Sequence, residues 1–276
     1  MTGSSSSSFP VDSSLMDKVA EHNRRAWDRQ AREGCRWSTP ASPEEIADAR
    51  KGSPRIILTP DTPLPREWLG ELRGRRVLCL ASAGGQQAPL LAAAGAEVTS
   101  FDLSGEQLAL DQQVADREGL SLRLVQGDMR DLSALGDGAY DLIVHVTSNC
   151  FVPDVEQVWR ECHRVLAPGG ELLAGFMNPA FFLFDHDEVE QGGTPVVRYA
   201  LPYSDERSLA PARLAKLLED GELLESSHSL DAQIGGQIRA GFVITGLFED
   251  SWSERPLSRW LKPMLSTRAK KTRAAR

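Results

Sequence analysis

The feature that most constrains the fold is an alternation of short apolar segments with amphipathic segments in the middle of the chain. Apolar runs predict strands at 77–80, 97–101, 122–126, 140–146 and 171–176. Helical spacing of apolar residues predicts helices between them, at 88–94, 104–118 and 155–166. Ser104 and Gln107 have the spacing of a capping box. Strands that alternate with helices of this length predict an α/β fold with a doubly wound, mostly parallel sheet.

The flanking regions complete the sheet and add further parts. Leu15 to Arg32 predicts a helix, and Ser42 followed by Pro43 predicts the start of a second. After Phe176 the alternation lapses, and it resumes with a helix over 231–240 and strands over 242–248 and 264–269, which makes seven strands. The expected organisation is a disordered tail (1–11), an N-terminal helical lid (12–69), a core (70–180), an inserted cap (181–229), the remainder of the core (230–270) and a basic tail (271–276).

Composition narrows the class of partner. The net charge is −8, from 31 basic and 39 acidic residues, and an acidic protein repels a polyanion, so no nucleic-acid partner is expected. The four cysteines form no C-x-x-C pair, so we expect free thiols and no metal site. No apolar run reaches the length of a membrane span, and the N-terminus lacks the order of a signal peptide. We therefore expect a cytoplasmic protein, either a monomer or a homodimer.

Three predicted strand ends carry groups that suit an adenosine. Small residues, Ala81 to Gly85, follow the first strand and let a ligand approach the backbone closely. Asp102 ends the second strand, where a carboxylate can accept hydrogen bonds from both ribose hydroxyls. Gly127-Asp128-Met129 follows the third strand and offers an acceptor for the adenine amine and an apolar edge for the ring. Each feature alone also fits a turn or a helix cap, but together they indicate a nucleoside site at the carboxyl edge of the sheet.

With Tyr140-Asp141-Leu142-Ile143 and the run from Arg164 to Gly170, these motifs resemble the class I S-adenosylmethionine-dependent methyltransferases. The resemblance covers about residues 70–180 well and 228–250 more loosely, and it implies a Rossmann-like fold. The run from Leu80 to Gln87 resembles a small-molecule, UbiE-like bacterial subgroup. The sequence departs from the family at Cys79, where an acidic residue is usual, and at Ala81 and Ala83, where glycine is usual.

The resemblance implies S-adenosylmethionine as cofactor and S-adenosylhomocysteine as product. The residues expected to bind it lie at the strand ends and on the lid: Trp27, Trp37, Ala81, Ser82, Ala83, Gly85, Asp102, Leu103, Gln107, Gly127, Asp128, Met129 and His145. A nicotinamide-dependent oxidoreductase is disfavoured, because its fingerprint glycines would fall on Ala81, Ala83 and Gln86.

The acceptor is expected to lie between the later strand ends and the cap. Candidate catalytic residues are His228, His145 and Tyr203, and candidate substrate contacts are Asn149, Phe151, Phe176, Asn178, Phe182 and Tyr199. The cap from Phe181 to Tyr203 is aromatic and has one basic residue, Arg198, which favours a small, neutral, indole- or phenol-like metabolite of secondary metabolism. A non-catalytic regulatory binder of the cofactor and a methyltransferase for a non-aromatic small molecule remain open alternatives.

Overall fold

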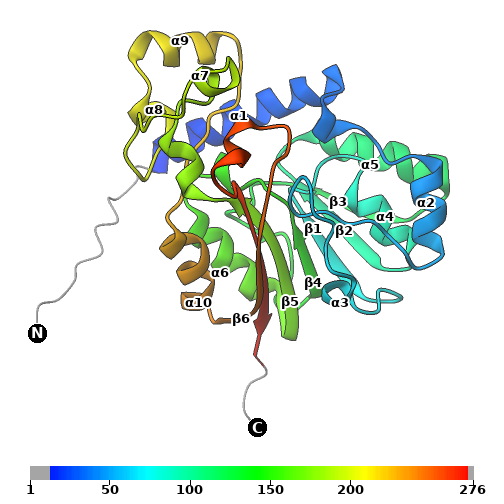
Figure 1. Cartoon of the computed structure of the whole chain (residues 1–276). Helices are drawn as coiled ribbons and strands as arrows, with labels where there is room; N and C mark the ends of the chain where they lie inside the picture. Colours follow the sequence, from blue (N-terminus) through cyan, green and yellow to red (C-terminus); the bar gives the residue numbers. More distant parts are fainter. Residues whose placement is uncertain (1–12, 273–276) are drawn as a thin grey trace, which may run out of the picture.

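The computed structural model describes residues 13–272, and its centre is one seven-stranded sheet (Figure 1). The strands are β1 (Arg76–Leu80), β2 (Glu97–Asp102), β3 (Leu122–Gln126), β4 (Tyr140–His145), β5 (Leu166–Met177), β6 (Phe242–Asp250) and β7 (Met264–Lys271). Their order is β3-β2-β1-β4-β5-β7-β6. β1 to β5 pair in parallel, whereas β7 runs antiparallel to both β5 and β6. The predicted α/β class and the mostly parallel, seven-stranded sheet are confirmed.

The helices cover both faces of this sheet and one of its edges. Their bounds are α1 (Ser13–Glu33), η1 (Arg36–Ser38), α2 (Pro43–Arg50), α3 (Arg66–Leu69), α4 (Gln87–Ala93), α5 (Gly105–Glu118), η2 (Asn149–Phe151), α6 (Val155–Val165), η3 (Pro179–Leu183), α7 (His186–Glu190), α8 (Asp205–Ser208), α9 (Pro211–Glu219), η4 (Asp231–Gly235), α10 (Gly236–Arg239) and η5 (Pro256–Arg259). Figure 1 shows α1 lying across the top of the sheet, between α5 and the group formed by α7, α8 and α9. None of the described helices is long and apolar enough to cross a membrane.

Alternating side chains of β1, an interior strand of the sheet, contribute to two separate cores. Leu78 and Leu80 of β1 point to one face, where they join the fully buried Trp159 of α6. Val77 and Cys79 point to the other face and pack in a cluster that includes Leu91 of α4. The apolar run from Val77 to Leu80 therefore reflects a sheet that is covered on both sides.

Three local predictions need correction. The strand predicted over 171–176 begins earlier, because β5 starts at Leu166 and includes Pro168-Gly169-Gly170, with a bulge between the pairs Tyr140–Leu166 and Leu142–Glu171. The helix expected over 231–240 begins with a π-helical segment, η4, before α10. Lys271, expected in a basic tail, ends β7, and its Nζ donates to the carbonyls of His163 and Leu166 at 2.6 and 2.7 Å. The expectation of a disordered tail at 1–11 lies outside the described residues, as does the end of the basic tail.

The reversed direction of β7 has a geometric consequence for any site at the carboxyl edge of the sheet. Met264, the first residue of β7, pairs with Met177, the last residue of β5. The loop between β6 and β7 therefore lies at the same edge as the carboxyl ends of the parallel strands. This edge brings together segments that are far apart in the sequence.

Candidate active site

A cavity of about 440 Å³ lies at the carboxyl edge of the sheet. This volume is within the range of small-molecule sites. Residues at the ends of β2 and β5 line it, Asp102 and Met177, together with Met264 at the start of β7. Ala20, Asn23 and Trp27 of α1 also line it, so α1 covers the cavity.

The loop after β1 has an unusual backbone for its residues. Ala81 and Ala83 line the cavity, and both have positive φ, 46° and 66°. These are the two positions at which the family usually has glycine, and a left-handed alanine costs on the order of 1 kcal/mol. Gly84 permits close packing, because a Cβ there would lie 2.4 Å from the backbone oxygen of Gln107. The alanines therefore keep the glycine-type turn at some energetic cost, while Gly84 has no room for a side chain.

Two side chains of α5 hold this loop from behind. Gln107 Oε1 accepts from the Gly84 N–H at 2.8 Å, and Asp111 Oδ1 accepts from the Gly85 N–H at 2.7 Å. Ser100 Oγ donates to the other Asp111 oxygen at 2.6 Å. The capping box predicted for Ser104 is therefore half formed, because Ser104 accepts from the Gln107 N–H while the Gln107 side chain binds the loop. Asp111 supplies a buried carboxylate near the position where the family's acid is replaced by Cys79.

Asp102 presents a carboxylate to the cavity without a counter-charge. It is half-buried at the end of β2, and its Oδ1 accepts from the Ser104 N–H at 2.9 Å. Among residues 13–272 no cation forms an ion pair with it. Burial, with smaller contributions from Asp111 and Asp28, raises the pKa of the Asp102 carboxyl to about 7. Such a carboxylate is suited to accept hydrogen bonds from ligand hydroxyls.

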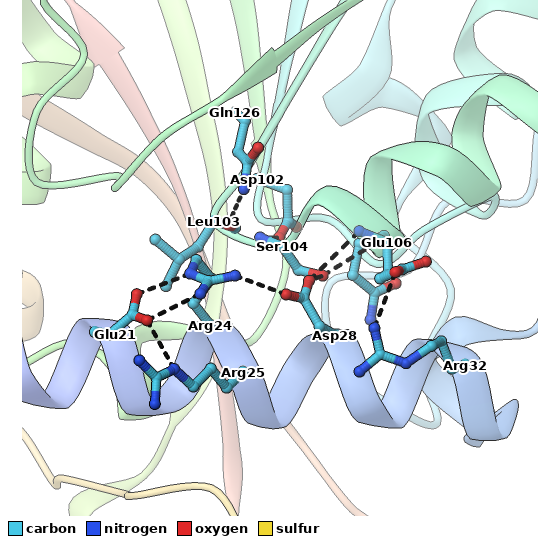
Figure 2. Close-up of polar contacts among 11 residues, drawn as sticks. Glu21, Arg24, Arg25, Asp28, Arg32, Asp102, Leu103, Ser104, Glu106 and Gln126 are labelled. Carbon is cyan, nitrogen blue, oxygen red and sulfur yellow. Dashed lines mark hydrogen bonds and ion pairs between the residues drawn. The ribbon is translucent and has the colours of Figure 1, made fainter.

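Figure 2 shows how α1 docks beside Asp102. Ser104 Oγ donates to Asp28 Oδ1 at 2.6 Å, and the other Asp28 oxygen pairs with Arg24 at 2.8 Å. One turn further along, Arg32 pairs with Glu106 of α5 at 2.9 Å. Asp28 therefore fixes α1 to the start of α5, next to the residue that ends β2.

Asn23 fixes α1 at a second place. Its side chain is 1% exposed, its Oδ1 accepts from the Leu224 N–H at 2.8 Å, and its Nδ2 donates to the Leu224 carbonyl at 3.0 Å. Nδ2 also lies 3.2 Å from the Phe151 carbonyl. Asn23 thus joins the lid helix to the segment after α9 and to η2, which closes the cavity on that side.

Asp128 already has a partner on its own loop. Arg130 donates twice to Asp128 Oδ2, from Nη2 at 2.6 Å and from Nε at 3.0 Å. Both residues line the cavity with Met129. A carboxylate has about four lone-pair sites, so Asp128 retains capacity for a further donor.

The structure brings together most of the residues predicted to bind the cofactor. Those that line the cavity are Trp27, Trp37, Ala81, Ala83, Asp102, Leu103, Gln107, Asp128 and Met129, and the predicted substrate contact Phe151 joins them. Ser82, Gly85 and Gly127 are not among the lining residues. The Gly127 N–H donates to the Asp102 carbonyl, and a Cβ at Gly127 would lie 2.5 Å from the Phe101 ring, so this glycine shapes the loop.

The three candidate catalytic residues do not line the cavity. His145 is fully buried and contacts the Leu80 carbonyl and Asn149 Oδ1, at 3.0 and 2.7 Å. His228 Nε2 lies between the carbonyls of Asn149 and Val152 at 3.0 and 2.8 Å. The Tyr203 hydroxyl donates to Asp205 at 2.6 Å. Each side chain therefore forms internal hydrogen bonds, and none of the three is among the residues that line the cavity.

Five of the six predicted substrate contacts also lie away from the cavity. They are Asn149, Phe176, Asn178, Phe182 and Tyr199. Phe176 is fully buried in the core, because its position on β5 faces the sheet interior. Phe182 stacks on Tyr203 at 5.5 Å, and the Tyr199 hydroxyl donates to Asp185 at 2.8 Å. The cap aromatics therefore pack mainly on one another.

Other residues form the wall instead, and the predicted site set did not contain them. They include Ile57, Thr59, Arg130, Met177, Phe181, His186, Glu225, Trp252, Arg255 and Met264. Phe181 lies in the predicted cap, but Trp252 and Arg255 lie in the loop between β6 and β7, which carries no recognisable motif. Only the antiparallel position of β7 shows that this loop reaches the cavity.

Glu225 is a second carboxylate that faces the cavity without a counter-charge. It is half-buried and, within the described part of the chain, forms no ion pair. Burial and the neighbouring Asp205 raise the pKa of its carboxyl to about 7. Glu222, which also lines the cavity, differs because it pairs with Arg29 at 3.3 Å.

Comparisons with known proteins identify the family of this chain. Residues 78–174 match the family model of the methyltransferase domain. The uncharacterised methyltransferase YbaJ of Bacillus subtilis is 46% identical over 235 residues, which are 85% of this chain and 92% of that protein. A ubiquinone biosynthesis O-methyltransferase of Xanthomonas oryzae is 34% identical over 160 residues, 55% of this chain and 64% of that protein.

A solved structure supports the fold independently. An S-adenosylmethionine-dependent methyltransferase from Mesorhizobium loti matches with a TM-score of 0.58 and 22% identity, over 74% of this chain and 94% of that one. The relative from Bacillus subtilis, by its identity and coverage, shows the family. The chain therefore belongs to the class I S-adenosylmethionine-dependent methyltransferases, and S-adenosylmethionine is its cofactor.

Proposed function

We propose that this methyltransferase acts on a small aromatic or heteroaromatic metabolite, indole- or phenol-like. The observation that carries the proposal is the wall of the cavity around Phe181, Trp252, Trp37, Met177 and Met264, which we call the acceptor end. We call the loops after β1, β2 and β3 the cofactor end. The two ends lie on different strands, since β2 and β5 are three strand spacings apart, or about 14 Å.

The residues present at the cofactor end fit the cofactor. Asp102, which faces the cavity and forms no ion pair within residues 13–272, would hold the ribose hydroxyls, and Asp128 with Met129 would hold the adenine. The loop from Ala81 to Gly85 would lie along the methionine part. When bound, the cofactor supplies an electrophilic methyl group on a sulfonium. The chain orients the two reactants and, through α1, excludes water from them.

The acceptor end is shaped for a flat ring. Phe181 and Trp252 have ring centroids 6.3 Å apart with an interplanar angle of 23°, and Trp37 meets Trp252 edge-on at 6.1 Å. Met177 and Met264 add polarisable sulfur atoms, which make favourable contacts with aromatic rings. Aromatic and thioether walls bind a planar apolar ligand at little conformational cost.

The charge at the acceptor end suits a neutral ligand. Arg255 lines the cavity, but it pairs with Glu190, and its guanidinium lies 4.5 Å from the centroid of the Trp252 ring. A phosphorylated acceptor would need cations that are not already paired, as Arg255 is with Glu190. The relatives named ubiquinone biosynthesis O-methyltransferases add support, since similarity to them extends over much of the core.

Binding measurements test the proposal directly. Indole and 4-nitrophenol should bind the protein saturated with S-adenosylhomocysteine, and cyclohexanol should bind more weakly. Trp252→Leu should weaken ring binding roughly tenfold while the affinity for S-adenosylhomocysteine stays unchanged. A screen of metabolite pools with cofactor labelled in its methyl group would then identify the product. Preferred methylation of a sugar phosphate or an oligonucleotide, or equal binding of cyclohexanol and indole, would refute the proposal.

A further inference from the structure

Of the five histidines, all within residues 13–272, His186 alone lines the cavity. The others have contacts elsewhere. His145 and His228 bind internal carbonyl and amide groups, His22 contacts the Glu222 carbonyl at 2.6 Å, and His163 packs edge-on against Phe242 at 5.1 Å. The aromatic acceptor end thus contains one imidazole.

The contacts of His186 define which nitrogen is free. His186 is the first residue of α7, and its ring lies against Phe181 with centroids 3.9 Å apart. Its Nε2 lies 3.0 Å from the Phe181 carbonyl. A carbonyl only accepts, so Nε2 carries the hydrogen, and a neutral ring then has its lone pair on Nδ1. Within the described chain, Nδ1 has no hydrogen-bond partner.

The surroundings keep this ring neutral. Burial is the largest influence and lowers the pKa of His186; the hydrogen bond to the Phe181 carbonyl raises the pKa by less, and Arg255 lowers it further. Asp185 and Asp187 raise the pKa by less, and both pair with Arg213, while Arg255 pairs with Glu190. A histidine that is neutral near pH 7 is ready to accept a proton rather than to donate one.

We infer that His186 Nδ1 accepts the proton of the acceptor, which is therefore an arene with a hydroxyl or a ring N–H. This inference rests on the proposed aromatic acceptor and selects oxygen or nitrogen over ring carbon as the methylated atom. The acceptor oxygen or nitrogen forms a bond to the methyl carbon as the carbon–sulfur bond breaks. The electron pair of that bond stays on sulfur, and the acceptor's proton passes to Nδ1 and then to solvent. Phe181 holds both the imidazole, by its carbonyl, and the substrate ring, by its side chain.

The ionisation of 4-nitrophenol provides a test that requires no turnover, because its phenolate absorbs at a longer wavelength than the phenol. The probe is bound to protein saturated with S-adenosylhomocysteine, and its ionisation is followed against pH. In the wild type the midpoint should lie lower than in His186→Gln by about one pH unit or more. Glutamine keeps a donor for the Phe181 carbonyl but has no nitrogen that titrates. His163→Gln, which changes a half-buried histidine of α6 that packs against Phe242 and does not line the cavity, should match the wild type.

Two further results separate the possible failures. 4-Nitroanisole, which has no proton to give, should bind wild type and His186→Gln equally. Equal midpoints in the two proteins, or equal weakening of both probes by His186→Gln, would show that His186 is only a wall residue. If neither probe binds the wild type, the aromatic acceptor itself is refuted. Should His186→Gln fold poorly, nitrogen NMR of the wild type decides the question, because 4-nitrophenol should protonate Nδ1 and 4-nitroanisole should not.

Discussion

The cofactor end and the acceptor end of one cavity are built in different ways. The cofactor end comes from three consecutive strand–loop units, and its loop after β1 is held by Gln107 and Asp111 of the helix that follows β2. The acceptor end combines η1, η3, α7, the end of β5, the start of β7 and the loop before β7. Local structure therefore fixes the cofactor end, whereas the acceptor end depends on the assembled fold.

The largest expected effect tests how rigidly the cofactor end is fixed. Gly84→Ala would place a methyl group 2.4 Å from the Gln107 backbone oxygen and 2.8 Å from its Cα. The loop or α5 must shift, so the free energy of unfolding should fall by about 1–3 kcal/mol. Binding of S-adenosylhomocysteine should weaken by roughly tenfold or more, which corresponds to about 1.4 kcal/mol of binding free energy, because the loop that lies along the cofactor is displaced. Chemical denaturation and calorimetry measure the two effects, and an unchanged affinity would show that the loop is more adaptable than its packing indicates.

The next effect concerns the carboxylate at the end of β2. Asp102→Ala should weaken S-adenosylhomocysteine binding by ~1–3 kcal/mol, because the ribose hydroxyls lose their acceptor. The pKa of Asp102 is about 7, and the ionised form accepts the hydroxyl hydrogens, so the wild-type affinity should fall as the pH drops from 8 to 6. In Asp102→Ala this part of the pH dependence should vanish. Asp116→Ala, an exposed site on α5, is the control, and a loss there of the same size would remove the ribose assignment.

A smaller effect on stability should distinguish Glu225 from Glu222, the two carboxylates near the lid helix α1. The pKa of Glu225 is raised from 4.5 to about 7, so its stabilising contribution is complete below pH 4.5 and is lost as the pH rises through 7. Glu225→Gln removes this loss, and the free energy of unfolding at pH 8 should rise by roughly 1–2 kcal/mol after allowance for partial exposure. Thermal denaturation at pH 5 should show little gain. Glu222→Gln is the matched control, because Glu222 pairs with Arg29 and should give no gain at either pH.

The smallest effect tests the strained alanines. Ala83→Gly relieves a φ of 66°, worth on the order of 1 kcal/mol, but adds roughly 0.5–1 kcal/mol of backbone entropy to the unfolded chain. The melting temperature and the S-adenosylhomocysteine affinity should therefore stay close to those of the wild type. An alanine methyl group would therefore change stability and cofactor affinity little at position 83, and would lower both at position 84. A large loss of affinity in Ala83→Gly would mean that the alanine methyl itself contacts the cofactor.

The fold and the cavity residues could be predicted only where the relevant sequence pattern is local. Strand periodicity predicted the sheet, and the residues that end β2 and β3 predicted a ligand site at which Asp102, Asp128 and Met129 do line the cavity, because each signal lies within a few residues. Gln107 showed only capping-box spacing, and no local pattern shows that its side chain binds the loop after β1 instead. His228 and Tyr203 looked suitable by residue type, but internal hydrogen bonds use both. Trp252 and Arg255 could not be found, because only the pairing of β7 with β5 places their loop at the cavity.

The reversed last strand also bears on how such an enzyme can change its substrate. The loop from Ser251 to Pro263 is anchored at each end by the β6–β7 hairpin, and Asp250 at its base accepts from Thr59 Oγ1 at 2.8 Å and from the Thr62 N–H at 2.8 Å. Its interior supplies Trp252 and Arg255 to the acceptor end and no residue of the motif loops. Substitutions in this loop can therefore change which acceptor binds while the loops that hold the cofactor stay the same. Acceptor specificity can diverge through this one segment, in nature or in the laboratory. Libraries of variants with substitutions only between Ser251 and Pro263 would test new acceptors while the cofactor end stays intact.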